Sequence, residues 1–140
     1  MTQNNNGSSK SVLFVCVENS CRSQMAEALL NNMQIKGVKA YSAGSSPSGE
    51  VNILAQEVMK EIGINISYYV SKGIDSLPVK EFEYIVGMGC NDSCPTLPAR
   101  EHIQWQITDP KGKDIDFFRK TRDEIKVKIG ELVESISQTG

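Results

Sequence analysis

A cysteine and an arginine stand at a spacing that can do chemistry in the segment Cys16-Val17-Glu18-Asn19-Ser20-Cys21-Arg22-Ser23. A cysteine thiolate is a nucleophile, and a planar guanidinium can bind two oxygens of an anion at once. A serine directly after the arginine can donate a hydrogen bond to the sulfur and stabilise its anionic form. The pattern predicts attack by the Cys16 sulfur on a bound oxyanion.

The flanking residues indicate how this segment is held. Residues 11–15 are apolar and β-branched, which is typical of a buried strand, whereas residues 23–30 have the composition and apolar spacing of a helix. A sharp turn between them aims backbone N–H groups inward at the positive end of the helix, where an oxyanion binds. The expected oxyanion-binding residues are Val17, Glu18, Asn19, Ser20, Cys21, Arg22 and Ser23. The acidic Glu18 repels an anion, so we expect its side chain to point outward.

A strand-terminal cysteine is often only a small apolar side chain in the core. Here the arginine, the strand and the helix all fall where an anion cradle needs them, which favours the catalytic interpretation of Cys16. The same positive field favours its thiolate form.

Composition is compatible with a small enzyme. The 140 residues suffice for one domain, and a net charge of −2 gives no reason to expect nucleic acid or an anionic membrane as a partner. We expect residues 1–10 to be a disordered polar tail and residues 11–140 to form a single domain. No signal-peptide pattern or long apolar run is present, so we expect a cytoplasmic protein whose four cysteines are reduced.

The remaining pattern alternates strands and helices. Further strands are predicted at residues 38–42, 84–88 and 102–106, and helices at residues 51–62 and from Asp116, the expected N-cap, to the C-terminus. This order predicts an α/β fold, a three-layer α/β/α domain with a four-stranded parallel sheet. Ligands of such sheets bind at the carboxyl ends of the strands, which is where the Cys16 segment lies.

Two further clusters follow predicted strands. Cys90 and Cys94 are four residues apart, so a helical turn would bring their side chains near disulfide range. With the single His102 they fall short of the four ligands usual for zinc, and we expect no metal. Two idle loop cysteines remain the other alternative. Asp109 precedes Pro110 at the end of the last predicted strand, where a carboxylic acid can protonate a leaving oxygen.

Together these motifs resemble the arsenate reductases built on the low-molecular-weight protein tyrosine phosphatase fold, especially the thioredoxin-coupled group. The resemblance spans nearly the whole chain from Lys10. The residues that carry it are Cys16 to Glu27, Tyr41-Ser42-Ala43-Gly44, Cys90 with Cys94-Pro95, and Asp109-Pro110 with Gly112-Lys113. Phosphatases of this fold usually have proline at the position of Gln24. The cysteine pair after the third strand is the strongest discriminator.

The resemblance implies that arsenate is the substrate and is reduced to arsenite for arsenic detoxification. It assigns Cys16 as nucleophile, Arg22 as oxyanion ligand, Asp109 as general acid, and Cys90 and Cys94 as the thiols of a disulfide relay. It implies an external reductant, either thioredoxin or glutaredoxin with glutathione. We expect a monomer without a cofactor. Some relatives hold a monovalent cation beside the anion loop; we predict none here, because Lys72 falls where an acidic ligand would be expected.

Two other functions remain open. A low-molecular-weight protein tyrosine phosphatase is the alternative enzyme, but Lys111-Gly112 follows Asp109-Pro110 where aromatic residues usually grip a phenol ring. A sensor chelating a trivalent metalloid through Cys90 and Cys94 is the non-catalytic alternative, and it would have no use for the Cys16 cradle.

Overall fold

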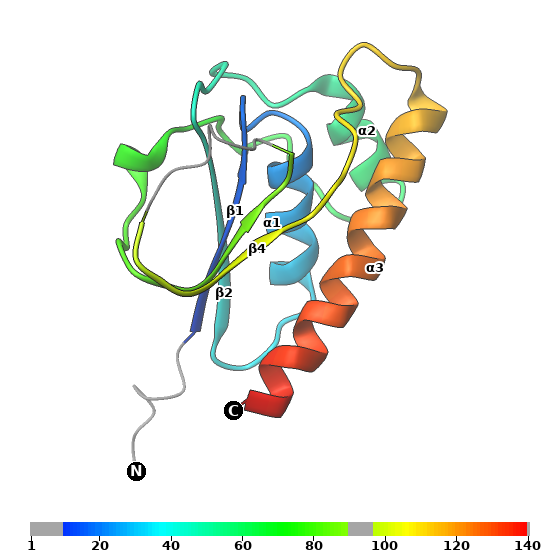
Figure 1. Ribbon diagram of the computed structural model, residues 1–140. Helices are drawn as coiled ribbons and strands as arrows, with labels where there is room; N and C mark the ends of the chain where they lie inside the picture. Colours follow the sequence, from blue (N-terminus) through cyan, green and yellow to red (C-terminus); the bar gives the residue numbers. More distant parts are fainter. Residues whose placement is uncertain (1–9, 90–96, 140) are drawn as a thin grey trace.

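A four-stranded parallel sheet forms the centre of the protein, as predicted, with strand order β2-β1-β3-β4 (Figure 1). The computed structural model describes residues 10–89 and 97–139. The strands are β1 (Lys10–Cys16), β2 (Val38–Gly44), β3 (Phe82–Gly87) and β4 (Ala99–Gln104). β1 is buried between β2 and β3, which explains why its sequence is apolar from Val12 to Cys16.

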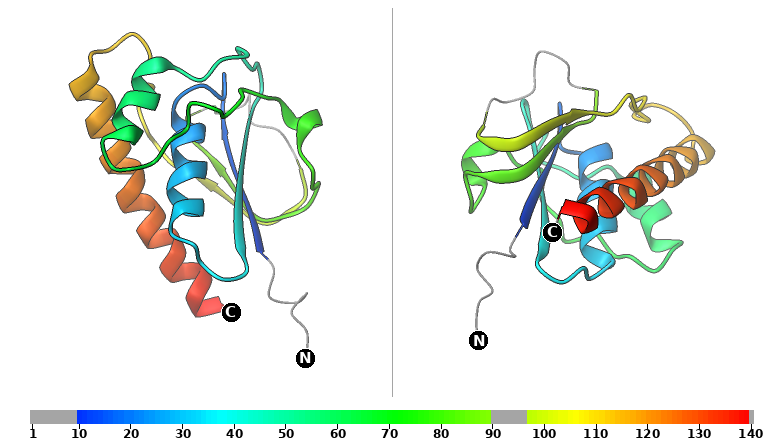
Figure 2. Two further views of the ribbon diagram at one scale, coloured as in Figure 1. Left: turned by 180° about the vertical axis from the view of Figure 1, so that it is seen from behind. Right: turned by 60° about the horizontal axis from the view of Figure 1, so that its bottom comes forward.

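The two faces of the sheet are covered unequally. The helices α1 (Arg22–Asn32), α2 (Ile53–Lys60) and α3 (Ile115–Thr139) pack on one face around the larger apolar core. The other face carries a smaller core beneath the short 3₁₀ helix η2 (Ile74–Ser76) and its flanking segments (Figure 2). Along the described parts of the chain, no helix is both long enough and apolar enough to cross a membrane.

Most element boundaries differ from the prediction by about one to three residues, and two of them concern residues with a specific role. β4 ends at Gln104, so Trp105 follows the strand and packs its ring 5.8 Å from that of Phe14. The backbone N–H of Trp105 still donates to the carbonyl oxygen of Gly87 in β3 at 2.8 Å, so hydrogen bonding to the sheet continues one position past β4. α3 begins at Ile115, and its cap is Asp114, whose Oδ1 accepts a 3.0 Å hydrogen bond from the backbone N–H of Phe117. Asp116 was therefore wrongly predicted as the N-cap.

α2 and α3 are joined by an ion cluster at the end of α2. Glu61 accepts hydrogen bonds from Arg119 and from Arg122, at 2.6 Å and 2.9 Å for the shortest contact of each. Arg122 also donates to the backbone carbonyl of Val58 and to the Asp123 carboxylate. Since Arg122 is nearly buried, this cluster fixes α3 against α2 and hence against the core.

The carboxyl ends of the strands meet at one edge of the sheet. Cys16 ends β1 and Gly44 ends β2 beside it. A Cβ on Gly44 would lie 2.6 Å from the carbonyl oxygen of Val17 and 2.8 Å from the backbone nitrogen of Asn19, so only glycine lets the loop after Cys16 approach β2 this closely.

Candidate active site

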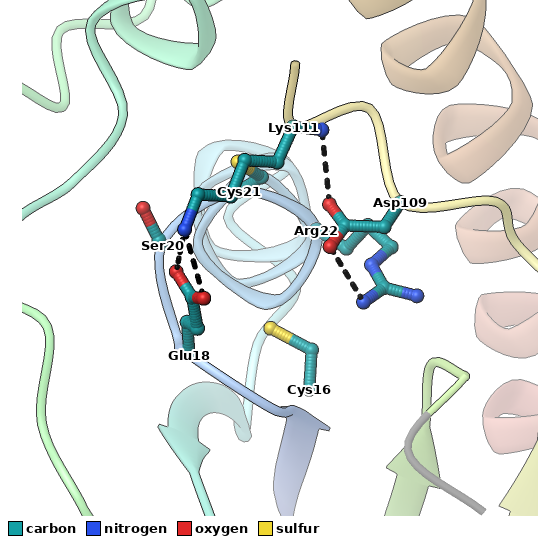
Figure 3. Close-up of a pocket in the computed structure, with 7 residues that line it drawn as sticks. All are labelled: Cys16, Glu18, Ser20, Cys21, Arg22, Asp109 and Lys111. Carbon is teal, nitrogen blue, oxygen red and sulfur yellow. Dashed lines mark hydrogen bonds and ion pairs between the residues drawn. The ribbon is translucent and has the colours of Figure 1, made fainter. Parts of the chain in front are cut away.

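The loop between β1 and α1 curls over the sulfur of Cys16, which is almost completely buried. Figure 3 shows the pocket at this loop, lined by Cys16, Glu18, Ser20, Cys21, Arg22, Asp109 and Lys111. Asn19 has a φ of 53°, a left-handed conformation that turns the chain sharply toward the start of α1 at Arg22. The strand, turn and helix thus occupy the positions predicted for an oxyanion cradle.

The buried hydrogen bonds around Asn19 determine whether Ser23 or Cys16 donates the proton in the hydrogen bond between them. The Asn19 Oδ1 accepts from the Gln24 side chain and from the backbone N–H of Lys72, both at 2.8 Å, so its amide nitrogen must face the other way. That nitrogen donates to Ser23 Oγ at 2.8 Å. Ser23 Oγ lies 2.9 Å from the Cys16 sulfur. Because its oxygen already accepts a proton from Asn19, the Ser23 hydroxyl is free to donate to the sulfur, which stabilises a thiolate.

Arg22 is held by two backbone carbonyls from different segments. Its Nη1 donates to the carbonyl oxygens of Met88, at 2.5 Å, and Ile107, at 2.9 Å. The next residue after Met88 is Gly89, with a φ of 96°, and a Cβ there would collide with the same Nη1. The guanidinium position therefore requires glycine at this point. Arg22 Nε is buried without a hydrogen-bond partner among the described residues.

Asp109 faces Arg22 from the segment after β4 (Figure 3). Its Oδ2 lies 3.6 Å from Arg22 Nη2, and its Oδ1 accepts a hydrogen bond from the backbone N–H of Lys111. About half of the Asp109 side chain is exposed, at 49 %. A carboxyl group that lines the same pocket as the Cys16 sulfur can protonate an oxygen leaving the bound anion.

The expectation that Glu18 points outward is wrong. Both oxygens of its carboxylate lie 2.8 Å from Lys111 Nζ, and both side chains line the pocket. This contact raises the pKa of Lys111, chiefly through the hydrogen bond with Glu18. The unfavourable carboxylate in an anion loop is thus paired with a cation from another segment.

Cys21 shares the pocket with Cys16 but has a different environment. It is 4 % exposed, and burial raises the pKa of its thiol to about 12, with the nearby Asp109 charge adding to the shift. Cys21 is therefore a neutral thiol at physiological pH, and the arrangement gives it no nucleophilic role.

Lys72 lies beside the loop, at the place considered for a monovalent cation. Its Nζ is 3.7 Å from the Glu27 carboxylate and 3.5 Å from Ser42 Oγ, and Ser42 in turn donates to Glu27. The ammonium brings a positive charge to these oxygens. Within residues 10–89 and 97–139, no group of three or more His, Cys, Asp or Glu side chains is placed to hold a metal ion.

The structure brings together Cys16, Arg22 and Asp109, whereas Cys90 and Cys94 lie outside the described residues. One residue of the pocket, Lys111, and one residue that positions Arg22, Gly89, were missed from sequence. Lys111 follows the predicted acid by two positions, and a basic residue beside an acidic anion loop was an available signal. Gly89 directly after an apolar strand was a second signal, because glycine there indicates a turn or a close approach.

Comparisons with known proteins agree with this geometry. Residues 11–140 match the model of the family described as low molecular weight phosphotyrosine protein phosphatase. An arsenate reductase from Staphylococcus aureus is 42 % identical over 126 residues, which cover 86 % of this chain and 93 % of that protein.

Solved structures include both reductases and phosphatases. A thioredoxin-dependent arsenate reductase of Corynebacterium glutamicum is 35 % identical with a TM-score of 0.75, covering 94 % of this chain and 64 % of that one. A low molecular weight protein tyrosine phosphatase from T. tengcongensis is 29 % identical with a TM-score of 0.79, covering 91 % of this chain and 99 % of that one. On the match over residues 11–140 and on its similarity to the arsenate reductases, the chain belongs to the low molecular weight phosphotyrosine protein phosphatase family.

Proposed function

We propose that the protein reduces arsenate to arsenite, with the Cys16 sulfur as nucleophile. The observation that carries the proposal is the convergence of a sulfur hydrogen-bonded by Ser23, a buried guanidinium and a carboxyl group on one pocket. The similarity to arsenate reductases over most of the chain supports arsenate as the oxyanion.

In the first step the Cys16 thiolate attacks arsenic, and a sulfur–arsenic bond replaces an arsenic–oxygen bond. The backbone N–H groups of residues 17–23 and the Arg22 guanidinium bind the remaining oxygens. Asp109 gives its proton to the departing oxygen, which leaves as water.

In the second step the Cys90 thiolate attacks the Cys16 sulfur. A Cys16–Cys90 disulfide forms, the sulfur–arsenic bond breaks, and its electron pair stays on arsenic, which leaves as arsenite. Cys94 then attacks Cys90, so that a Cys90–Cys94 disulfide forms and Cys16 is released. The two shuttle residues are assigned from sequence.

An external dithiol must reduce the final disulfide, and we propose thioredoxin or glutaredoxin with glutathione for this role. The name of the Corynebacterium relative favours thioredoxin. We propose that the enzyme acts in the cytoplasm as a monomer and serves arsenic detoxification.

The decisive measurement is arsenate-dependent consumption of NADPH with a thioredoxin system and, separately, with a glutaredoxin–glutathione system. Consumption with one system identifies the reductant. Rapid hydrolysis of an aryl phosphate with no arsenate reduction in either system would replace the proposal with the phosphatase alternative.

Two variants test the order of the thiol steps. Cys94→Ser should release about one arsenite per enzyme and then stop, because Cys16 and Cys90 remain joined. Cys16→Ser should release none. Sustained turnover by Cys94→Ser with the same reductant would remove Cys94 from the mechanism.

A further inference from the structure

An ion pair spans the pocket between two segments that are 93 positions apart in the sequence. In Figure 3, Glu18 lies on one side of the pocket and Arg22 and Asp109 lie on the other. The Lys111 side chain runs from the Asp109 segment to the Glu18 carboxylate and contacts both of its oxygens. The pair therefore connects the segment that supplies the acid to the loop that binds the anion.

Stability does not account for this pair. The Lys111 and Glu18 side chains are 54 % and 35 % exposed, and ion pairs at such exposure contribute little to stability because solvent screens them. Glu18 is also unfavourable in an anion loop, and Lys111 offsets its charge. The residues together add no net charge to the pocket, so they do not simply increase its attraction for anions.

The position of the pair relates to the leaving group. An oxygen displaced by the Cys16 sulfur must lie opposite that sulfur and near Asp109, and Lys111 is two residues beyond Asp109. In a free oxyanion the leaving oxygen carries at most a proton. In an ester it carries a carbon substituent, which must pass the place where Lys111 meets Glu18. The cavity between the lining residues is about 10 Å³, roughly the room of one water molecule, so any ligand requires the lining to shift, and a ring requires a larger shift than a free oxyanion.

We propose that the Glu18–Lys111 ion pair closes the pocket mouth and makes the site selective for free oxyanions over phosphate esters. The inference rests on the proposed function and deepens it, because it names two residues that separate an oxyanion reductase from an ester hydrolase. A free oxyanion fits beneath the bridge after a small shift of the flexible Lys111 side chain, whereas an ester must break the pair.

The test is a binding measurement with two probes on the reduced, full-length protein. Inorganic phosphate represents the free oxyanion, and phenylphosphonate represents an ester that cannot be cleaved. The double variant Glu18→Gln with Lys111→Met removes the bridge and preserves the net charge. We expect it to improve the affinity for phenylphosphonate relative to phosphate about ten-fold, which corresponds to about 1.4 kcal/mol. Titration calorimetry measures both dissociation constants.

Lys113→Met is the matched control. It removes one positive charge from the same segment, but the Lys113 Nζ lies over the Phe117 ring, 5.7 Å from its centroid. We expect its relative affinity for the two probes to stay within two-fold of the unmodified protein. A double variant that changes this ratio less than two-fold, or a control that changes it equally, overturns the proposal.

The two single variants distinguish an effect of charge on anion affinity from an effect of closing the pocket mouth. Glu18→Gln should bind phosphate more tightly and Lys111→Met more weakly, each by about five-fold at low salt, because each leaves one unpaired charge at the mouth. Both should bind phenylphosphonate better relative to phosphate; a gain in only one of them contradicts closure by the pair. These measurements need no turnover. If the binding results are as expected but the protein reduces no arsenate, the closure proposal stands and the proposed function is wrong. If the protein reduces arsenate but the binding results are not as expected, the proposed function stands and the closure proposal is wrong.

Discussion

Arg22 and Arg122 show how one residue type serves two purposes at similar burial. They are 6 % and 9 % exposed, and both donate to backbone carbonyls. At the junction of α2 and α3, the carboxylates of Asp123 and Glu61 accept hydrogen bonds from Nε and Nη1 of Arg122, both at 2.9 Å. In the anion loop the only carboxylate near Arg22 among the described residues is 3.6 Å away, and Nε has no partner. A guanidinium in direct contact with two carboxylates holds helices together, whereas one without such close carboxylates remains available to a ligand.

The sharpest way to break this comparison is to replace each arginine with lysine. Arg22→Lys keeps the charge and loses the planar fork, so we expect kcat/KM for arsenate to fall at least about 100-fold. Arg122→Lys should leave kcat/KM within about two-fold but lower the free energy of unfolding by about 1–3 kcal/mol, because partly buried acceptors lose a donor. Steady-state kinetics and urea denaturation of both variants measure this. Equal kinetic losses would show that the two arginines do not differ in role.

A substitution at Gly89 sharpens the comparison because it displaces the Arg22 guanidinium while Arg22 itself is unchanged. Gly89→Ala places a Cβ against the guanidinium and adds strain at a positive φ, so we expect phosphate to bind about ten-fold more weakly. Gly49→Ala is the control, since its φ of 91° imposes similar strain and its Cβ meets nothing within 4 Å. Titration calorimetry gives the dissociation constants. Equal weakening in both variants would assign the effect to strain elsewhere in the chain.

Replacing Glu61 tests the ion cluster around Arg122, and it is the prediction with the smallest expected effect. Hydrogen bonds, first from Arg119 and then from Arg122, hold the pKa of Glu61 below its usual 4.5. A lowered pKa in the folded state means that the stabilisation is complete above pH 4.5 and is lost as the pH falls through the folded-state value. Glu61→Gln should therefore lower Tm at pH 7, and its deficit should shrink below pH 4.5. Thermal unfolding across this range measures it, and a deficit constant with pH would exclude the charge as the cause.

Much of the fold and part of the site could be predicted because they depend on local patterns. The continuous apolar run ending at Cys16, and the helix that follows Arg22, fix the loop between them at an edge of the sheet. Parallel strands with short connections then bring Asp109 to the same edge. These inferences need only residue order, periodicity and the geometry of parallel sheets.

The rest depends on contacts between distant residues. Lys111 and Glu18 pair across 93 positions, and nothing local indicates which cation meets which carboxylate. Trp105 lies one position past the end of β4 although its backbone N–H still bonds to Gly87, and where a strand ends depends on its partner strand. The choice of Asp114 over Asp116 as helix cap depends on a shift of two residues, which composition cannot resolve.

The buried Cys21 has a consequence for how the protein withstands oxidative damage. With a thiol pKa of about 12, raised mainly by burial, this residue stays protonated at neutral pH, and protonated sulfur reacts slowly with peroxides and alkylating agents. Two sulfur atoms line one small pocket, but burial keeps that of Cys21 protonated, whereas that of Cys16 lies 2.9 Å from the Ser23 hydroxyl. An oxidant that enters the pocket therefore meets a single reactive sulfur, that of Cys16. An unproductive disulfide between Cys16 and Cys21 is disfavoured.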